Sequence, residues 1–150
     1  MSYNDVETAL ATQIAAIAGF STAAGTGNVT RGDFRLVTRG ISSGVVLEYA
    51  GFDDKLVAEA GQFLTDWKIN IDLFIRWLDD ENAYTVSKSA RQAILDRIRQ
   101  FPKLGTSIVF HAMIESGDPS PEDLEMGGVR YAFEILRLTA TEDVSVSYAE

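Results

Sequence analysis

The segment Trp67-Lys68-Ile69-Asn70-Ile71-Asp72-Leu73-Phe74-Ile75-Arg76-Trp77 carries the most regular pattern in the sequence. Its odd-numbered positions are all apolar, and its even-numbered positions are polar except for Phe74. Side chains of a β-strand point alternately to the two faces of a sheet, so this pattern predicts a long strand with one buried face. The next run, Asp79-Asp80-Glu81-Asn82, supplies turn and helix-capping side chains and predicts the end of the strand.

Helical patterns flank this strand on both sides. From Asn4 onward, apolar residues recur at the spacing of one helix face, and Gly19 is a typical helix stop. A second helical pattern covers residues 83–101 and ends at Pro102 and Gly105. Each pattern has one apolar stripe, which predicts a helix that packs by one side onto the sheet.

Three more strands are predicted. Residues 41–49 alternate like a half-buried strand, and residues 129–140 form the last strand. Residues 106–115 are apolar on both sides, which predicts a central strand covered on both faces. The remaining segments have no sustained period: two arms at 19–40 and 50–65, an acidic connection at 116–128, and an acidic, mobile tail at 141–150. We expect at most a short strand in the first arm, at residues 34–37.

The predicted order is helix, strand, strand, helix, strand, strand, with no internal repeat. It predicts an α+β fold in a single domain over residues 1–150. The expected architecture is a small mixed or antiparallel sheet of about four strands, packed by two main helices, with long arms. A length of 150 residues fits one domain with one sizeable core.

The composition excludes several classes of function. The chain has no cysteine, which removes disulfides, thiolate zinc sites and cysteine nucleophiles and suits synthesis in a reducing compartment. A net charge of −9 disfavours broad binding to nucleic acid or to anionic membranes. No apolar run approaches the roughly 18 residues that a membrane-spanning helix needs. The first residues also lack the basic region of a signal peptide.

No motif predicts catalysis. The single histidine, His111, lies in a predicted strand without a second histidine, so we expect a packed or hydrogen-bonded side chain rather than a metal ligand. Gly25-Thr26-Gly27-Asn28 resembles half of a phosphate-binding loop, but it follows a helix instead of preceding one. The acidic run at 79–81 lacks the alternating ligands of a calcium loop. We therefore expect no enzymatic activity, no metal and no cofactor.

Charge is segregated along the chain. The second predicted helix region is basic, whereas residues 115–125 are acidic without a basic residue. On a monomer these would be two solvated surfaces, but in a self-assembling protein opposite patches suit head-to-tail contacts that close into rings. The candidate subunit-interface residues, taken from the first arm, the helix and the acidic connection, are Arg31, Phe34, Arg35, Arg91, Arg97, Arg99, Glu122, Asp123 and Glu125.

The whole chain resembles the tail terminator (tail completion) proteins of long-tailed bacteriophages in layout and length. The matching features are Ala18-Gly19-Phe20 at the end of the first helix, the Asn28-Val29 arm, the strand Trp67–Leu73, the helix segment Arg91–Ile98 and the strand start Tyr131-Ala132-Phe133-Glu134-Ile135. The resemblance implies a virion protein that forms a ring, usually a hexamer. Such a ring caps the tail tube, joins it to the head connector or head-closure protein, and lets DNA pass through its lumen. It implies no enzymatic residues.

Two other interpretations stay open. The chain could be another phage neck component, such as a head-closure protein, or a minor tail component. In a different class, it could be a small-molecule-binding domain that uses the sheet face of Trp67 and Trp77 as a pocket wall. That function predicts a stable monomer or dimer that a metabolite stabilises.

Overall fold

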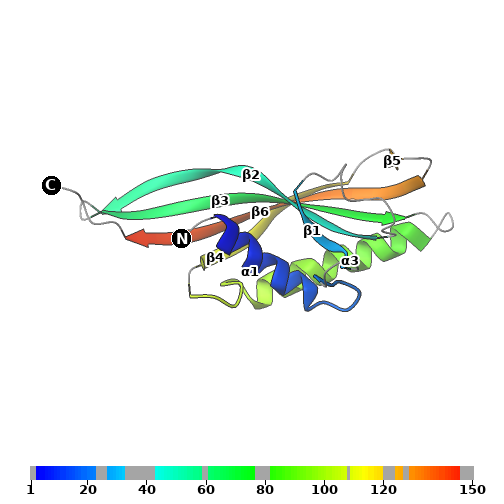
Figure 1. Ribbon diagram of the computed structural model, residues 1–150, viewed down its shortest axis with the longest axis horizontal. Coiled ribbons are helices and arrows are strands. Elements are labelled where there is room, and N and C mark those ends of the chain that lie inside the picture. The colour runs from blue at the N-terminus through cyan, green and yellow to red at the C-terminus, as the bar shows by residue number, and fades with distance from the viewer. Residues whose placement is uncertain are drawn as a thin grey trace.

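The computed structural model describes residues 3–22, 27–32, 43–58, 61–76, 82–107, 109–119, 124–126 and 129–145. Within these residues, two helices and six strands follow one another (Figure 1). They are α1 (Tyr3–Ala15), β1 (Val29–Arg31), β2 (Ser43–Ala58), β3 (Gln62–Arg76), α3 (Asn82–Gln100), β4 (Val109–Pro119), β5 (Leu124–Met126) and β6 (Val129–Ser145).

The strands form one mixed sheet. Their order is β1-β2-β3-β6-β4, and β5 pairs with β6 beside this path. β1 runs parallel to β2, whereas the other pairs are antiparallel. The predicted α+β class is confirmed, and β1 and β5 are short additions to the four expected strands.

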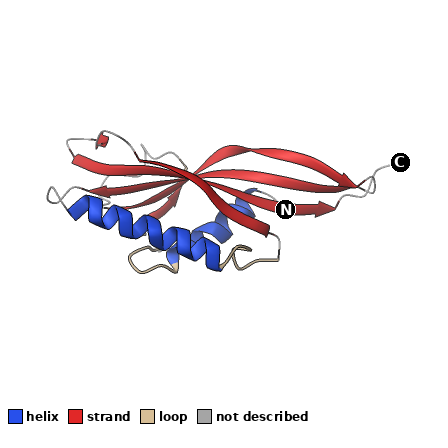
Figure 2. Cartoon of the chain, turned by 180° about the vertical axis from the view of Figure 1, so that it is seen from behind, coloured by secondary structure: helices blue, strands red, loops and turns tan. Residues whose placement is uncertain are grey.

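The core lies between the helices and one face of the sheet. Figure 2 shows α1 and α3 on the same side of the strands. The apolar stripe of α1, which includes Val6 and Leu10, packs in one cluster with Ile94 and Ile98 of α3. The predicted buried face of β3 is confirmed, because Ile71 and its odd-numbered neighbours from Ile69 to Ile75 belong to this cluster.

The prediction of an arm at residues 50–65 is wrong. β2 continues to Ala58 and β3 already begins at Gln62, so most of this segment is a long β-hairpin. The register shifts between Tyr49 and Phe52, where Gly51 has a positive φ of 107°. Such a bulge shifts the alternation by one residue, which hid the continuing strand from a period-two pattern.

The prediction of a mobile tail from residue 141 is also wrong for its first part. β6 continues to Ser145 and pairs with the start of β3, from Thr65 opposite Glu142 to Gln62 opposite Ser145. Residues 146–150 lie outside the described part of the chain. Together, residues 50–58 of β2, 62–66 of β3 and 141–145 of β6 form an extension of the sheet, here called the distal ribbon. Only at its base does β4 pair with it, through Val109 opposite Glu142 and His111 opposite Thr141. The distal ribbon projects beyond both helices, at the left of Figure 1.

The strand predicted at 106–115 lies at the edge of the sheet rather than in its centre. Within the described residues β4 pairs with β6 alone, and Met113 and Glu115 are exposed on its outer side. β4 also continues to Pro119, and β5 occupies Leu124–Met126, so the acidic connection is partly strand. The prediction was wrong because apolar side chains on both sides of a strand occur in two situations. They occur in a central strand covered on both faces, and also in an edge strand that lines a pocket.

The first arm contains a strand earlier than expected. β1 lies at Val29–Arg31, whereas residues 34–37 are outside the described part of the chain. The Asn28 side chain fixes its start, accepting a hydrogen bond from the Ser21 amide at 2.8 Å and donating one to the Gly19 carbonyl at 2.8 Å. Gly44 of β2 lets β1 approach closely, because a methyl group there would overlap the Asn28 carbonyl oxygen.

Candidate subunit-interface surfaces

Arg31 joins β1 to α1. Its Nε lies 3.4 Å from the Glu7 carboxylate, and its Nη2 donates a hydrogen bond to the Thr8 hydroxyl at 2.9 Å. The Glu7 side chain is buried, whereas the Arg31 side chain is partly exposed. A buried carboxylate needs a compensating partner, so Arg31 stabilises the packing of the first arm on the helix.

Arg91 and Arg97 hold α3 in a similar way. Arg91 Nη1 lies 3.4 Å from both carboxylate oxygens of Glu134, a buried residue of β6. Arg97 Nε donates to the Gln13 side chain of α1 at 3.0 Å, and its guanidinium lies 4.0 Å above the Phe101 ring. These two predicted interface residues therefore make contacts that fix the helices within the chain.

Arg99 differs from the other three arginines. Its side chain is 71% exposed, and its distance to the Asp96 carboxylate one helical turn earlier is 4.0 Å. An ion pair this open is weak in water, so it leaves the guanidinium available to a partner. Lys103, just after α3, is also exposed.

The remaining predicted interface residues are described in part or not at all. Glu125 lies in β5, opposite Arg130 of β6 in the strand register. Phe34, Arg35, Glu122 and Asp123 lie outside the described residues. Their predicted role in a subunit interface stays a prediction.

The sequence patterns did not reveal the apolar surface of the distal ribbon. Among the described residues, four of the six exposed large hydrophobic side chains lie on β2, at or beyond its bulge; they are Tyr49, Phe52, Leu56 and Val57. Phe52 pairs with Trp67, and Leu56 with Phe63, so these side chains share the sheet face that the helices cover elsewhere. The sequence predicts an arm at residues 50–65, and an irregular arm has no sheet face on which an apolar surface would be expected.

An aromatic cluster links this surface to the core. The Tyr3 ring lies 4.7 Å from Tyr49 and 5.9 Å from Trp67, and Phe52 lies 5.5 Å from Trp67, measured between ring centroids. The Trp67 indole donates a hydrogen bond to the buried Glu142 carboxylate at 2.8 Å. Burial raises the pKa of the Tyr3 hydroxyl above its ordinary value, and the nearby Glu7 carboxylate raises it further.

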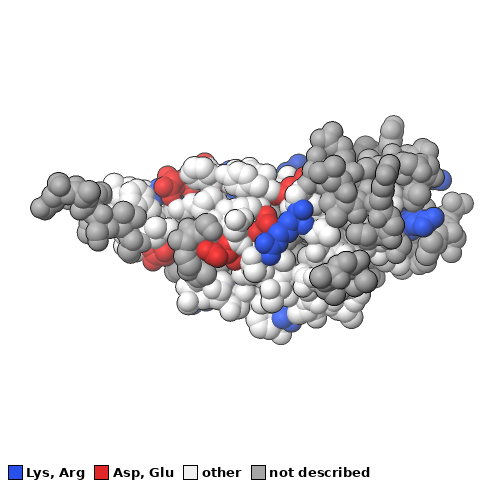
Figure 3. Space-filling view, in the orientation of Figure 1, with Lys and Arg blue, Asp and Glu red and all other residues white. Residues whose placement is uncertain are grey.

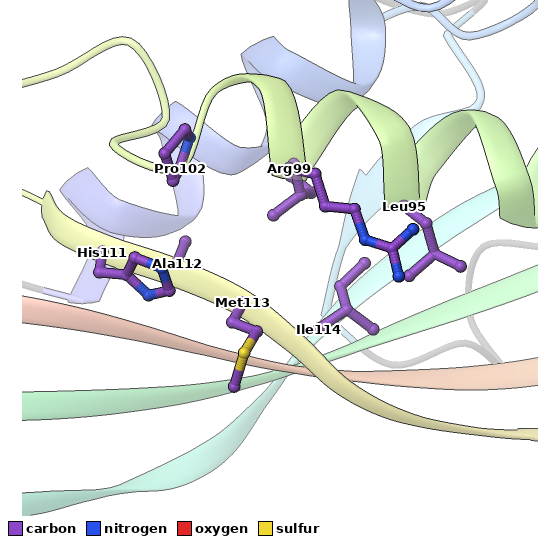
Figure 4. A pocket seen from close by; sticks show the side chains of 8 residues that line it. Leu95, Arg99, Pro102, His111, Ala112, Met113 and Ile114 are labelled. Atoms are coloured by element: carbon purple, nitrogen blue, oxygen red, sulfur yellow. The ribbon is translucent and has the colours of Figure 1, made fainter.

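A hollow of about 330 Å³ opens between α3 and the edge strand β4. Figure 4 shows Arg99 and Leu95 extending from α3 toward β4, where His111 and Met113 lie. His111 is exposed here and not packed, whereas the other expected state, a hydrogen-bonded side chain, stays a prediction. The lining is mostly apolar and consists of Leu95, Ile98, Arg99, Pro102, His111, Ala112, Met113 and Ile114.

The two surfaces carry opposite charge. The described residues of the distal ribbon include five carboxylates and one lysine; they are Asp53, Asp54, Asp66, Glu142, Asp143 and Lys55. Residues 82–107 include five basic side chains and one carboxylate; they are Lys88, Arg91, Arg97, Arg99, Lys103 and Asp96. In Figure 3, acidic side chains gather toward the left end, over the ribbon, and basic ones lie at the centre and right.

The described residues contain neither a metal-holding cluster nor a membrane-spanning helix. No group of three or more histidine, cysteine, aspartate or glutamate side chains in that part of the chain is placed to hold a metal ion. None of its helices is long and apolar enough to cross a membrane.

Comparison with known proteins gives a match in fold alone. No protein-family model matches the chain, and no curated protein matches its sequence. Among solved structures, the chain is similar to a chain of the virion of a native gene transfer agent particle, with a TM-score of 0.56 and 15% sequence identity. The match covers 94% of this chain and 99% of that one. The two chains therefore share one fold over nearly their whole length.

Proposed function

We propose that this chain is a structural protein of a phage-like virion, and within it a tail terminator. The observation that carries the proposal is the likeness in fold to a virion chain, which extends over nearly the full length of both chains. A partial match could reflect a common supersecondary unit, whereas this match extends over the whole arrangement of helices and strands.

In this proposal the chain forms a closed ring of copies, taken to be a hexamer. One side of the ring contacts the tail tube protein and the other side contacts the head connector or head-closure protein. DNA passes through the lumen without being held. A net charge of −9 suits this role, because an acidic wall does not retain a phosphate backbone. The protein has no catalytic step to perform and needs no cofactor.

The surfaces of the chain fit an assembling protein better than a small-molecule-binding one. Three large exposed apolar side chains, Phe52, Leu56 and Val57, lie on the distal ribbon, which suits contact with another protein. The hollow beside α3 is only partly enclosed, whereas small-ligand sites enclose most of their ligand.

The test is electron microscopy of the purified protein, alone and mixed with tail tubes of a phage whose own terminator has been deleted. We expect uniform rings in the first sample and capped tubes of normal length in the second. A matched control is the same protein with Ile71→Asp, which cannot fold and should give neither. Rings that bind a head connector but not a tube end would instead identify a head-closure protein.

A further inference from the structure

We propose that the distal ribbon of one copy docks into the α3–β4 hollow of the next copy, so that the ring is built from one repeated, head-to-tail contact. The inference rests on the proposed self-assembly, and it names the two surfaces that perform it. The ribbon is the donor surface, with Phe52 and Leu56 as its apolar contacts. The hollow is the acceptor surface, with an apolar floor and a basic rim.

The distribution of exposed apolar side chains supports this pairing. Six large hydrophobic side chains are exposed in the described part of the chain, and four of them are at or next to the ribbon. The other two, Met113 and Val86, lie on β4 and α3, and Met113 lines the hollow. Apolar patches of this kind on a folded chain mark protein contacts, and here they occur on two separate surfaces.

Charge decides which surface faces which. Two ribbons packed by the face of Phe52 and Leu56 would bring the exposed Asp54 side chains of both copies together. The other ribbon carboxylates contribute less there, because Asp53 is paired with Lys68, Glu142 is buried, and Asp66 and Asp143 are on the opposite face. Like charges at an interface disfavour that arrangement. The rim of the hollow has Arg99 and, beyond Pro102, Lys103, both exposed and basic. An acidic ribbon therefore fits the hollow and not another ribbon.

The carboxylates on β4 itself do not reverse this choice. Asp118 is paired with Arg137 of β6, so its charge is compensated within the chain. Glu115 follows the hollow along the strand and is not among its lining residues. The entrance of the hollow is thus bordered by Arg99 and His111.

The positions of the two surfaces fit a closed ring. β2 and β4 lie on opposite sides of the two central strands, β3 and β6. The β2 side of one copy can therefore meet the β4 side of the next copy, where β4 lines the hollow. A contact between two different surfaces is heterologous, and it propagates into a ring if the rotation closes.

Single-cysteine cross-linking tests the contact directly, because the natural chain has no cysteine and each engineered thiol is unique. The variants are Leu56→Cys on the ribbon and Met113→Cys at the hollow, treated with a short bismaleimide separately and as a mixture. We expect several-fold more cross-linked dimer in the mixture than in either variant alone. Ala18→Cys, at an exposed site after α1, mixed with each variant gives the background.

Two results would overturn the inference. One is a Leu56→Cys sample that cross-links to itself as well as the mixture does, which indicates a two-fold ribbon contact. The other is a mixture that gives no more product than the Ala18→Cys background. Ring formation by the variant Leu56→Asp separates this inference from the proposed function. An unchanged unfolding midpoint shows that the variant is folded. If Leu56→Asp still forms rings, the ribbon contact is wrong and the terminator proposal stands. If the cysteine mixture gives the expected cross-link but the wild-type protein never caps a tube, the terminator proposal is wrong and the contact stands.

Discussion

The covered half of the sheet and the distal ribbon are built from the same three strands but differ in what lies on them. Under the helices, Leu47 of β2 and Ile71 of β3 are fully buried opposite each other. In the ribbon, Leu56 of the same strand β2 is 57% exposed. Both regions carry an apolar face, so the strand pattern specifies which face is apolar, and the helices decide where that face is buried within one chain.

This difference predicts that substitution by alanine lowers the free energy of unfolding strongly under the helices and only slightly in the ribbon. Ile71→Ala should lower the free energy of unfolding by about 2–5 kcal/mol, because it leaves a cavity in a closed core. Leu56→Ala should change the stability of the monomer by less than about 0.5 kcal/mol, because its side chain already contacts water. Urea unfolding of both variants at a concentration where the protein is monomeric measures the contrast. Equal losses would show that the ribbon is covered within the chain.

The arginines of α3 give a second contrast. Arg91→Ala should cost about 1–3 kcal/mol, because it leaves the buried Glu134 carboxylate without its cation. Arg99→Ala, two turns along the same helix, should cost less than about 0.5 kcal/mol in the monomer, since its ion pair is exposed. Urea titrations report the stability, and sedimentation of the same variants reports assembly. If Arg99→Ala destabilised the monomer as much as Arg91→Ala, the proposed division between structural and free arginines would be wrong.

The smallest expected effect concerns Tyr3, which lies at the border between the two regions. In the unfolded chain its hydroxyl ionises near pH 10, as free tyrosine does. In the folded chain burial raises this pKa. The stabilising contribution is therefore complete below about pH 10, and it is lost as the pH rises toward the folded pKa, because the unfolded state releases its proton first.

Tyr3→Phe should remove this part of the pH dependence. Near pH 8 the variant should have nearly wild-type stability, because the ring contacts with Tyr49 and Trp67 are kept. Between about pH 10 and pH 11 the wild type should lose stability more steeply than the variant. Urea midpoints measured across this range test the slope, and Tyr49→Phe, an exposed tyrosine of the same cluster, is the control. Parallel slopes for wild type and Tyr3→Phe would contradict a raised pKa.

Much of the fold could be predicted from local patterns. The period of two over residues 67–77 located β3, and the helical stripes located α1 and α3. The predictions failed where a pattern was interrupted or ambiguous. A bulge at Gly51 concealed the second half of β2, and the edge position of β4 could not be distinguished from a central one by residue type.

The candidate interface was less accessible to prediction. Charge segregation identified α3 as basic, and Arg99 is indeed exposed there. The same reasoning selected Arg31, Arg91 and Arg97, which the fold uses for contacts inside the chain. A run of basic residues shows how many cations a helix has, but it does not show which of them face a distant carboxylate or amide.

The sequence by itself determined the α+β class, the apolar face of β3, the helical stripes and the exclusion of thiol chemistry, because each depends on residue type or on spacing within a single element. Only the tertiary structure decided which strands are neighbours, where the sheet leaves the helices, and which arginines have partners. These properties depend on pairs far apart in the chain, such as Arg91 with Glu134, Arg97 with Gln13 and Trp67 with Glu142. Such pairs form when strands and helices pack, and no local period encodes them.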